Sequence, residues 1–437
     1  MNPKHESMKL PLKKPALPRA ILAALAAFTT ASLLHAAGPA NLLRPGDHVA
    51  VCGDSITEQK RYSIYMELYL MACQPAANLE MVQFGWNGDT TWGFLERIPQ
   101  NVGPFAPQVA TTLYGMNDGG YLAADKAADR IQRFRTSLED MVKSFREIGV
   151  REIIIASPPP VDPVTFKRNT PEAYNPTLSM LGDIARDVAE KNKVRFADVN
   201  GIMTDAMKRA KAAKGWDYQV AGDDGVHPGS NGHLIIAYTL LKALGCDGTI
   251  GTLTWDCATG RAQTTDGHRI LSNTRAAIEI ESTRYPYCFP EDPQERAPTA
   301  RSILDIIPFN EELNRLMLVV KNAPAQKMRV TWGGHSRVYS AAELEKGINL
   351  AADFLDNPFC ENFARVIAAA RIQQDYETDG VRILLHSLNA WAKHFPEEAR
   401  LDAPRRRMVV QKAADYYAAT KSLLAPVKHT LRISPVK

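Results

Sequence analysis

Short apolar runs alternate with longer stretches of helical periodicity over the first half of the chain. The apolar runs are typical of strands and cover residues 48–52, 79–84, 109–113, 152–156 and 194–199. The helical stretches cover residues 62–73, 91–102, 126–148, 172–193 and 230–244. Apolar strands regularly separated by helices predict a parallel sheet with helices on both faces. Such open sheets bind ligands beyond the carboxyl ends of their strands, so we expect the chemistry in the loops that follow the strands.

The pattern changes after residue 245. Alternating β-like stretches at residues 276–282, 316–321 and 327–332 are separated by turns rich in glycine and proline. A helical pattern then begins at Ser340, whose spacing to Glu343 matches a capping box. The predicted organisation is a leader, an α/β domain, a β-rich accessory segment and a helical C-terminal extension, which cover residues 1–38, 39–249, 250–339 and 340–437.

The leader has the pattern of a secretory signal peptide. It begins with several basic residues, continues with the apolar run Ala20–Leu34 and ends in small residues. This run is shorter than the roughly 20 residues that span a bilayer, so an uncleaved anchor helix is the less favoured alternative. We therefore expect an exported protein, periplasmic or extracellular, without a stable membrane span.

Composition and charge narrow the function classes. The chain has 437 residues, 45% hydrophobic and 23% charged, which is typical of a soluble globular protein. The leader accounts for the whole net charge of +4, so the rest of the chain gives no reason to expect a nucleic-acid partner. Six cysteines are present without the spacing of a zinc site. An oxidising compartment would allow one or two disulfides, which the sequence alone does not pair, and Cys246 and Cys257 are the favoured candidates.

Two of the loops carry the residue types of nucleophilic catalysis. Ser55 follows the first predicted strand within Gly-Asp-Ser, at a strand-to-helix turn where backbone N–H groups favour a developing anion. The same residues can also serve only as a helix cap. Asp224 and His227 lie three residues apart before the last helix of this region, so the carboxylate can orient the imidazole.

Two other loops offer hydrogen-bond donors. Gly85 and Gly88 follow the second predicted strand and allow a ligand to approach the backbone closely. Asn117 follows the third strand, and its side-chain amide can donate to an oxyanion without carrying charge. The tetrahedral intermediates of acyl transfer need fixed donors of this kind.

Metal binding is an alternative for the acidic and histidine residues near the last helix. Asp223, Asp224, His227 and His233 match no standard zinc motif, so we expect no metal ligands among them. His233 is instead expected to lie on the helix surface or in the core.

The four loops together resemble the motifs of the SGNH (GDSL-type) serine hydrolase family, in the same order, over roughly residues 45–245. The resemblance implies a three-layer α/β/α, flavodoxin-like parallel sheet, which is the SGNH hydrolase fold. It implies Ser55 as the nucleophile, His227 as the general base and then acid, and Asp224 as the partner that orients the imidazole. No cofactor belongs to this chemistry.

The resemblance also implies an oxyanion hole. Its donors would be the N–H groups of Ser55 and Gly88 and the side-chain amide of Asn117. Gly85 is the alternative to Gly88, because both glycines stand in the same loop. The residues expected to form the substrate walls are aromatic: Trp86, Trp92, Tyr114 and Tyr121.

Export and the family resemblance together predict a serine esterase that hydrolyses small acyl esters, O-acetyl groups on carbohydrate in particular. An O-acyltransferase, or a lysophospholipase or thioesterase, is an alternative on the same fold. A non-catalytic glycan-binding protein is the alternative of another class, although such a protein would be expected to have lost part of the triad. Aromatic residues of the β-rich segment could bind glycans but are expected to pack its core: Trp255, Tyr285, Tyr287, Trp332 and Tyr339.

Overall fold

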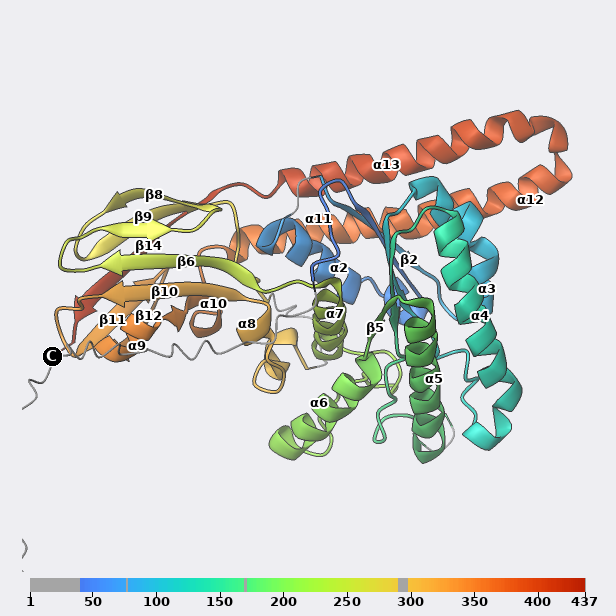
Figure 1. The fold of residues 1–437 in the computed structure, drawn as a ribbon, viewed down its shortest axis with the longest axis horizontal. Coiled ribbons are helices and arrows are strands. Elements are labelled where there is room, and N and C mark those ends of the chain that lie inside the picture. Colours follow the sequence, from blue (N-terminus) through green and yellow to red (C-terminus); the bar gives the residue numbers. More distant parts are fainter. Residues whose placement is uncertain (1–39, 76–77, 169–170, 290–297, 437) are drawn as a thin grey trace, which may run out of the picture. The chain divides into compact units, whose positions relative to one another are not determined.

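The computed structural model describes residues 40–75, 78–168, 171–289 and 298–436. The predicted signal peptide lies outside the described residues. From residue 40 onward the chain belongs to one compact unit (Figure 1). Within the described residues, no helix is long and apolar enough to cross a membrane.

A five-stranded parallel sheet forms the centre of the α/β region, with the strand order β2-β1-β3-β4-β5. Its strands are β1 (His48–Gly53), β2 (Glu80–Gly85), β3 (Val109–Leu113), β4 (Glu152–Ala156) and β5 (Arg195–Ala197). This flavodoxin-like order confirms the predicted fold class. The order reverses beside β1, so a crevice for ligands is expected where the carboxyl ends of β1 and β3 diverge.

Helices cover both faces of this sheet, as predicted. Val49 and Val51 of β1 pack in one core with side chains of α2 and α7, whereas Ala50 and Cys52 pack in another with side chains of α3 and α4. The two cores exist because successive side chains of a strand point to opposite faces. The helices are α1 (Ser55–Glu58), α2 (Tyr62–Leu68), α3 (Thr91–Arg97), α4 (Ala128–Glu147), α5 (Pro171–Asn192), α6 (Val199–Lys214) and α7 (Ser230–Leu244). Short 3₁₀ and π segments extend or join them: η1 (Tyr69–Cys73), η2 (Ile98–Val102), η3 (Gly103–Phe105) and η4 (Ala124–Lys126).

Helix α6 is not predicted by the sequence pattern. The whole apolar run 194–199 is expected to be strand, but Asp198 ends the strand and caps α6 by accepting a hydrogen bond from the Gly201 N–H at 3.0 Å. The pattern is weak because the exposed face of α6 is polar and alanine fills two of the buried positions. The buried residues are Val199, Met203, Ala206, Met207 and Ala210.

Two further sheets form the β-rich part, with the strand orders β13-β10-β6-β7 and β12-β11-β14-β9-β8. Their strands are β6 (Thr249–Asp256), β7 (Ala262–Thr264), β8 (His268–Asn273), β9 (Ala277–Ser282), β10 (Arg315–Lys321), β11 (Lys327–Trp332), β12 (His335–Ser340), β13 (Ile348–Asn349) and β14 (Val427–Pro435). The helices between them are η5 (Ala300–Ile303), α8 (Phe309–Glu312), α9 (Ala341–Lys346) and α10 (Leu350–Asp353). Ser340 and Glu343 form the predicted capping box at α9.

The large aromatic side chains of the β-rich part pack its core. Trp255, Tyr285, Tyr287 and Trp332 are all buried. Tyr339 is half-buried, and its hydroxyl donates to Asp353 Oδ2 at 2.9 Å. Four of the five aromatic residues therefore present no exposed ring face to a glycan.

The C-terminal extension is not helical to its end, contrary to the expectation. Its last described segment is β14, which lies between β11 and β9 in the five-stranded sheet. His429, Leu431 and Ile433 are buried at every second position, which is the period of a strand. The extension thus supplies the central strand of a sheet in the accessory segment. The division of the chain at residues 249 and 339 stays a prediction.

Between α10 and β14 the extension forms a helical hairpin (Figure 1). Its elements are α11 (Cys360–Asp379), the π-helix η6 (Gly380–Leu385), α12 (His386–His394), η7 (Pro396–Leu401) and α13 (Asp402–Ser422). Glu377 of α11 accepts a hydrogen bond from the Gln83 N–H of β2 at 2.9 Å. Because β2 is an edge strand of the parallel sheet, α11 covers backbone groups that would otherwise be open to pairing with another chain.

The predicted disulfide between Cys246 and Cys257 is not formed. All six cysteines are free. Cys246 lies just before β6 and Cys257 just after it, and the eight residues of this strand span roughly 25 Å at about 3.3 Å per residue. Their Cα atoms are therefore much farther apart than the roughly 7 Å that a disulfide tolerates.

Two buried carboxyl groups lie where α11 meets α2 and β2. Glu67 accepts hydrogen bonds from the side-chain amides of Gln373 at 2.5 Å and Gln374 at 2.6 Å. Glu377 accepts a hydrogen bond from the same Gln373 amide at 2.8 Å. Burial raises the pKa of Glu67 to about 7, and burial together with the charge of Glu67 raises the pKa of Glu377 well above its usual range. The contact between the extension and the α/β region therefore contains two carboxyl groups, and burial costs less free energy when they are protonated than when they are charged.

We expect the free energy of unfolding to fall as the pH rises from about 5 to about 8. The unfolded chain loses both protons near the ordinary value of 4.5, whereas in the folded chain the pKa is raised to about 7 at Glu67 and well above its ordinary value at Glu377. The native state therefore binds more protons in this interval, and each group contributes a slope of up to about 1.4 kcal/mol per pH unit. Urea unfolding at several pH values measures this slope.

Glu377→Gln should flatten the profile, because the amide carries no charge at any of these pH values. The side-chain oxygen at position 377 can still accept a hydrogen bond from the Gln83 N–H. Gln373 Oε1 has no partner among the described residues, so after a flip of the Gln373 amide it can accept a hydrogen bond from the new amino group at position 377. The matched control is Glu345→Gln on the exposed face of α9. Equal slopes for Glu377→Gln and the wild type would contradict this account.

Candidate active site

Ser55 lies at the first residue of α1, immediately after β1. The carboxylate of Asp54 caps this helix by accepting a hydrogen bond from the Ile56 N–H at 3.0 Å. Burial raises the pKa of Asp54 to about 7. The N–H of Ser55 is in the first turn of the helix, where backbone donors have no partner within the helix.

The imidazole of His227 connects Ser55 with Asp224. Its Nε2 lies 2.8 Å from Ser55 Oγ, and its Nδ1 lies 2.6 Å from Asp224 Oδ2. Because a carboxylate can only accept, Nδ1 carries the proton and Nε2 is free to accept the hydroxyl proton of Ser55. The structure therefore brings the three residues into a single hydrogen-bonded chain, although 172 residues separate Ser55 from His227.

Backbone hydrogen bonds hold the carboxylate of Asp224 in place. Its Oδ1 accepts from the N–H groups of Val226 at 2.8 Å and His227 at 2.9 Å. Partial burial raises the pKa of Asp224, but hydrogen bonds from the His227 side chain and from these N–H groups outweigh it, so the pKa lies below its ordinary value. Asp224 is therefore ionised at neutral pH and accepts the hydrogen bond from Nδ1 of the imidazole.

The loop after β2 distinguishes between the two candidate glycines. Gly85 ends β2 against α1, where an added Cβ would lie 2.3 Å from the Glu58 nitrogen, and its N–H donates to Gln83 Oε1 at 2.9 Å. Gly88 lies in an exposed turn with a left-handed φ of 74°, and no described residue accepts a hydrogen bond from its N–H. This arrangement favours Gly88 as the oxyanion donor, a role that stays a prediction.

The side-chain amide of Asn117 is fixed on both sides. Its nitrogen donates to the Asp89 carbonyl at 2.9 Å, and its oxygen accepts from the Tyr121 hydroxyl at 3.3 Å. The role of this amide as an oxyanion donor stays a prediction. Asp118, the next residue, accepts from the N–H and hydroxyl of Thr91 at 2.8 and 2.6 Å, which ties the loop after β3 to the start of α3.

Comparison with known proteins identifies the α/β region. Residues 51–235 match the model of the GDSL-like Lipase/Acylhydrolase family. This part of the chain belongs to that family. An acetylxylan esterase of Geobacillus stearothermophilus is 23% identical over 218 residues, which are 47% of this chain and 93% of the esterase. The family and this relative indicate that the chain is an enzyme that hydrolyses ester bonds.

Solved structures extend the comparison. A gut microbial diltiazem-metabolizing enzyme, BT4096, is similar over 92% of this chain and 100% of its own, with a TM-score of 0.73 and 20% sequence identity. The likeness shows that the fold is shared, including the β-rich part and the helical extension. The structure of the acetylxylan esterase Axe2 from Geobacillus stearothermophilus is 22% identical, covers 47% of this chain and 96% of its own, and has a TM-score of 0.39.

The four predicted wall residues of this GDSL-like hydrolase have different surroundings. Trp86 is half-buried in the loop after β2, and Trp92 is half-buried in the first turn of α3. Tyr121 is also half-buried, but its hydroxyl is engaged with Asn117. The prediction for Tyr114 is wrong: its side chain is 2% exposed and stacks on Phe94 in the core, because it points to the covered face of the sheet. A substrate has no access to it.

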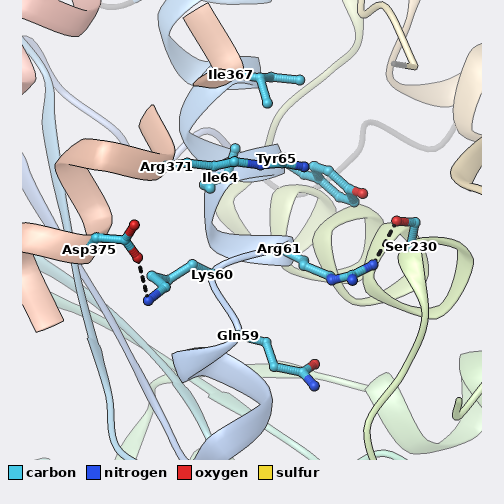
Figure 2. A pocket seen from close by; sticks show the side chains of 9 residues that line it. All are labelled: Gln59, Lys60, Arg61, Ile64, Tyr65, Ser230, Ile367, Arg371 and Asp375. Atoms are coloured by element: carbon cyan, nitrogen blue, oxygen red, sulfur yellow. Dashed lines mark hydrogen bonds and ion pairs between the residues drawn. The ribbon is translucent and has the colours of Figure 1, made fainter. Parts of the chain in front are cut away.

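A cavity of about 280 Å³ in this hydrolase lies next to the turn that follows α1 (Figure 2). Lys60 Nζ pairs with Asp375 Oδ1 at 2.7 Å across it, and Arg61 donates to Ser230 Oγ at 3.0 Å. The residues that line the cavity come from the turn between α1 and α2, from α2, from α7 and from α11: Gln59, Lys60, Arg61, Ile64, Tyr65, Ser230, Ile367, Arg371 and Asp375. The cavity lining therefore contains no predicted catalytic side chain.

His233 is a buried core residue, and its imidazole lies 2.7 Å from Gln59 Oε1 through Nε2. Burial holds the pKa of His233 well below its usual range, so the ring is neutral. Asp223 is exposed. Among the described residues, no group of three or more His, Cys, Asp or Glu side chains is arranged to hold a metal ion.

Sequence reasoning missed several residues that hold the loops of the site. Arg130 of α4 donates to the carbonyl oxygens of Asn117 at 3.3 Å and Asp118 at 3.0 Å. Glu58 of α1 accepts a hydrogen bond from the Asn87 N–H. No local pattern marks either residue, because each contacts a loop that belongs to a different element of the fold.

Asn117→Ala should lower kcat for a small ester about a hundredfold or more with little change in KM, because an oxyanion donor acts mainly in the transition state.

Tyr121→Phe should lower kcat several-fold, because the ring remains while the hydroxyl that orients the Asn117 amide is lost. Steady-state kinetics separate the two constants.

Tyr339→Phe is the matched control, since it removes a hydrogen-bonded hydroxyl in the β-rich part. A kcat for Asn117→Ala within a factor of two of the wild type would show that this amide is not an oxyanion donor.

Proposed function

We propose that the chain is an exported serine esterase that uses Ser55, His227 and Asp224 to hydrolyse small acyl esters, above all O-acetyl groups on carbohydrate. The observation that carries the proposal is the hydrogen-bonded chain from Ser55 Oγ through the imidazole to Asp224, with distances of 2.8 and 2.6 Å. A serine is a weak nucleophile unless a base of this kind takes its proton.

In the proposed first half-reaction, Ser55 Oγ attacks the acyl carbon while His227 Nε2 takes the hydroxyl proton. Asp224 stabilises the imidazolium that forms. The carbonyl oxygen becomes an oxyanion and accepts hydrogen bonds from the N–H groups of Ser55 and Gly88 and from the Asn117 amide. The intermediate collapses, His227 gives its proton to the leaving alcohol oxygen, and an acyl-enzyme ester remains on Ser55.

In the second half-reaction, water attacks the acyl carbon and His227 takes a proton from it. Collapse of the second tetrahedral intermediate breaks the bond to Ser55 Oγ, which regains its proton from the imidazolium. The products are the carboxylic acid and the free alcohol, and the enzyme returns to its initial state. Transfer of the acyl group to a sugar hydroxyl would differ only in the acceptor of this second step.

The surroundings of the triad support a large, polar alcohol. The side chain of His227 is 30% exposed and that of Asp224 is 49% exposed, and Gly88 lies on an exposed turn. A polymer can reach only a site that is open to solvent in this way. The acetylxylan esterase relative supports acetate as the acyl group, and the leader sequence supports export.

Ser55→Ala should lower kcat for p-nitrophenyl acetate by about four orders of magnitude or more, since the loss of the nucleophile disables the whole triad. Circular dichroism should show an unchanged fold. The control is Ser336→Ala, which removes an exposed hydroxyl in β12. Ser55→Ala activity close to that of the wild type would refute the nucleophile assignment.

A panel of acyl donors tests the substrate class. It compares acetylated xylan with diltiazem and with p-nitrophenyl esters of increasing chain length, and it measures both free acid and acylated acceptor. We expect release of free acetate, a preference for acetyl over longer acyl chains, and the highest kcat/KM on the acetylated polysaccharide. A preference for long chains would favour a lipase-like function, and an acetylated acceptor sugar would favour a transferase.

A further inference from the structure

Glu58 connects three parts of the chain. It ends α1, three residues after Ser55, and its side chain is 20% exposed. One carboxylate oxygen accepts a hydrogen bond from the Asn87 N–H in the loop after β2. The other accepts a charge-assisted hydrogen bond from the guanidinium of Arg382 in η6, 324 residues farther along the chain. The helical hairpin therefore reaches the candidate active site through this carboxylate.

A second contact joins the hairpin to the same loop. The guanidinium carbon of Arg382 lies 5.0 Å from the ring centre of Trp86, and the imidazole of His386 meets the same ring edge-on at 5.0 Å. Arg97 lies 4.6 Å from this ring and also pairs with Asp89 Oδ2 at 2.5 Å. The loop from Trp86 to Asp89 is thus held at its start by the hairpin and at its end by Arg97.

Gly88 lies between these two attachment points. It has no side chain of its own to fix it, and an added Cβ would meet no atom within 4 Å. Its N–H direction therefore depends on the neighbouring residues, of which Asn87 is held by Glu58. An oxyanion donor must be placed to within about 0.5 Å to act in the transition state.

We propose that Arg382 is a positioning residue for the oxyanion hole, acting through Glu58 and Trp86 on the loop that carries the Gly88 N–H. The inference rests on the proposed function and deepens it. Arg382 lies outside residues 51–235, so the family region does not supply this support by itself. The helical extension is accordingly a part of the catalytic unit.

The test measures kcat and KM for p-nitrophenyl acetate. Arg382→Ala should lower kcat about five- to twentyfold with KM nearly unchanged, because the loop still binds the substrate but presents the donor less well. Arg382→Lys keeps the charge that faces Glu58 and should recover part of the loss. Thermal unfolding checks that each variant is folded.

Arg406→Ala is the matched control. Arg406 of α13 also joins the hairpin to the α/β region, by donating to the Gln100 carbonyl at 2.7 Å, but Gln100 lies outside the Trp86–Asp89 loop. We expect its kcat to equal that of the wild type. If Arg382→Ala and Arg406→Ala behave alike, or if Arg382→Ala changes KM alone, the proposal is wrong.

A double-mutant cycle tests whether Arg382 acts through Glu58. Glu58→Gln can still accept a hydrogen bond from the Asn87 N–H but loses the ion pair with Arg382. Arg382→Ala should therefore lower kcat less in the Glu58→Gln background than in the wild type, and the loss that remains is the part that acts through Trp86. Independent, multiplicative effects would overturn the pathway. A parallel assay of Ser55→Ala distinguishes failure of the positioning role from failure of the proposed function. An active Ser55→Ala variant would refute both the esterase mechanism and the role of Arg382, whereas an inactive one leaves only the role of Arg382 in question.

Discussion

The hydrogen bond between Ser55 Oγ and His227 Nε2, at 2.8 Å, is the interaction on which the catalytic account depends. It joins a loop after the first strand to a loop before the last helix of the parallel sheet. The flavodoxin-like order brings both loops to the carboxyl ends of the strands, where the crevice beside β1 leaves room for a ligand. Asp224 then fixes the imidazole in the tautomer that can take the serine proton.

The parts of the chain beyond the family region are bound closely to it. Helix α11 covers the edge strand β2 through a buried network that includes Glu67 and Glu377, and β14 returns to complete a sheet of the β-rich part. These contacts link stability to pH, because burial raises the pKa of Glu67 to about 7 and that of Glu377 well above its ordinary value. The contacts of Arg382 link the same extension to the loop of Gly88. The extension thus contributes both to the stability of the fold and to the geometry of the site.

Local patterns were sufficient to predict the five strands, most of the helices and the four loops that carry the candidate site. Each of these features depends only on residues that are close together in the sequence, such as an apolar run or the three-residue spacing of Asp224 and His227. Features that depend on distant residues were not predicted. The sequence around Tyr114 does not say which face of the sheet it points to, and nothing near Arg382 marks its contact with Glu58. Proximity in sequence was also misleading for the two cysteines on either side of β6, since a strand holds its ends apart.

Covalent labelling tests the central claim most directly. A fluorophosphonate reacts with a serine that is activated by a neighbouring imidazole, and peptide mass spectrometry locates the adduct. The account predicts a single adduct on Ser55, formed orders of magnitude more slowly in His227→Ala than in the wild type. An active esterase that carries its adduct on another residue, or that labels Ser55 equally fast without the imidazole, would contradict it.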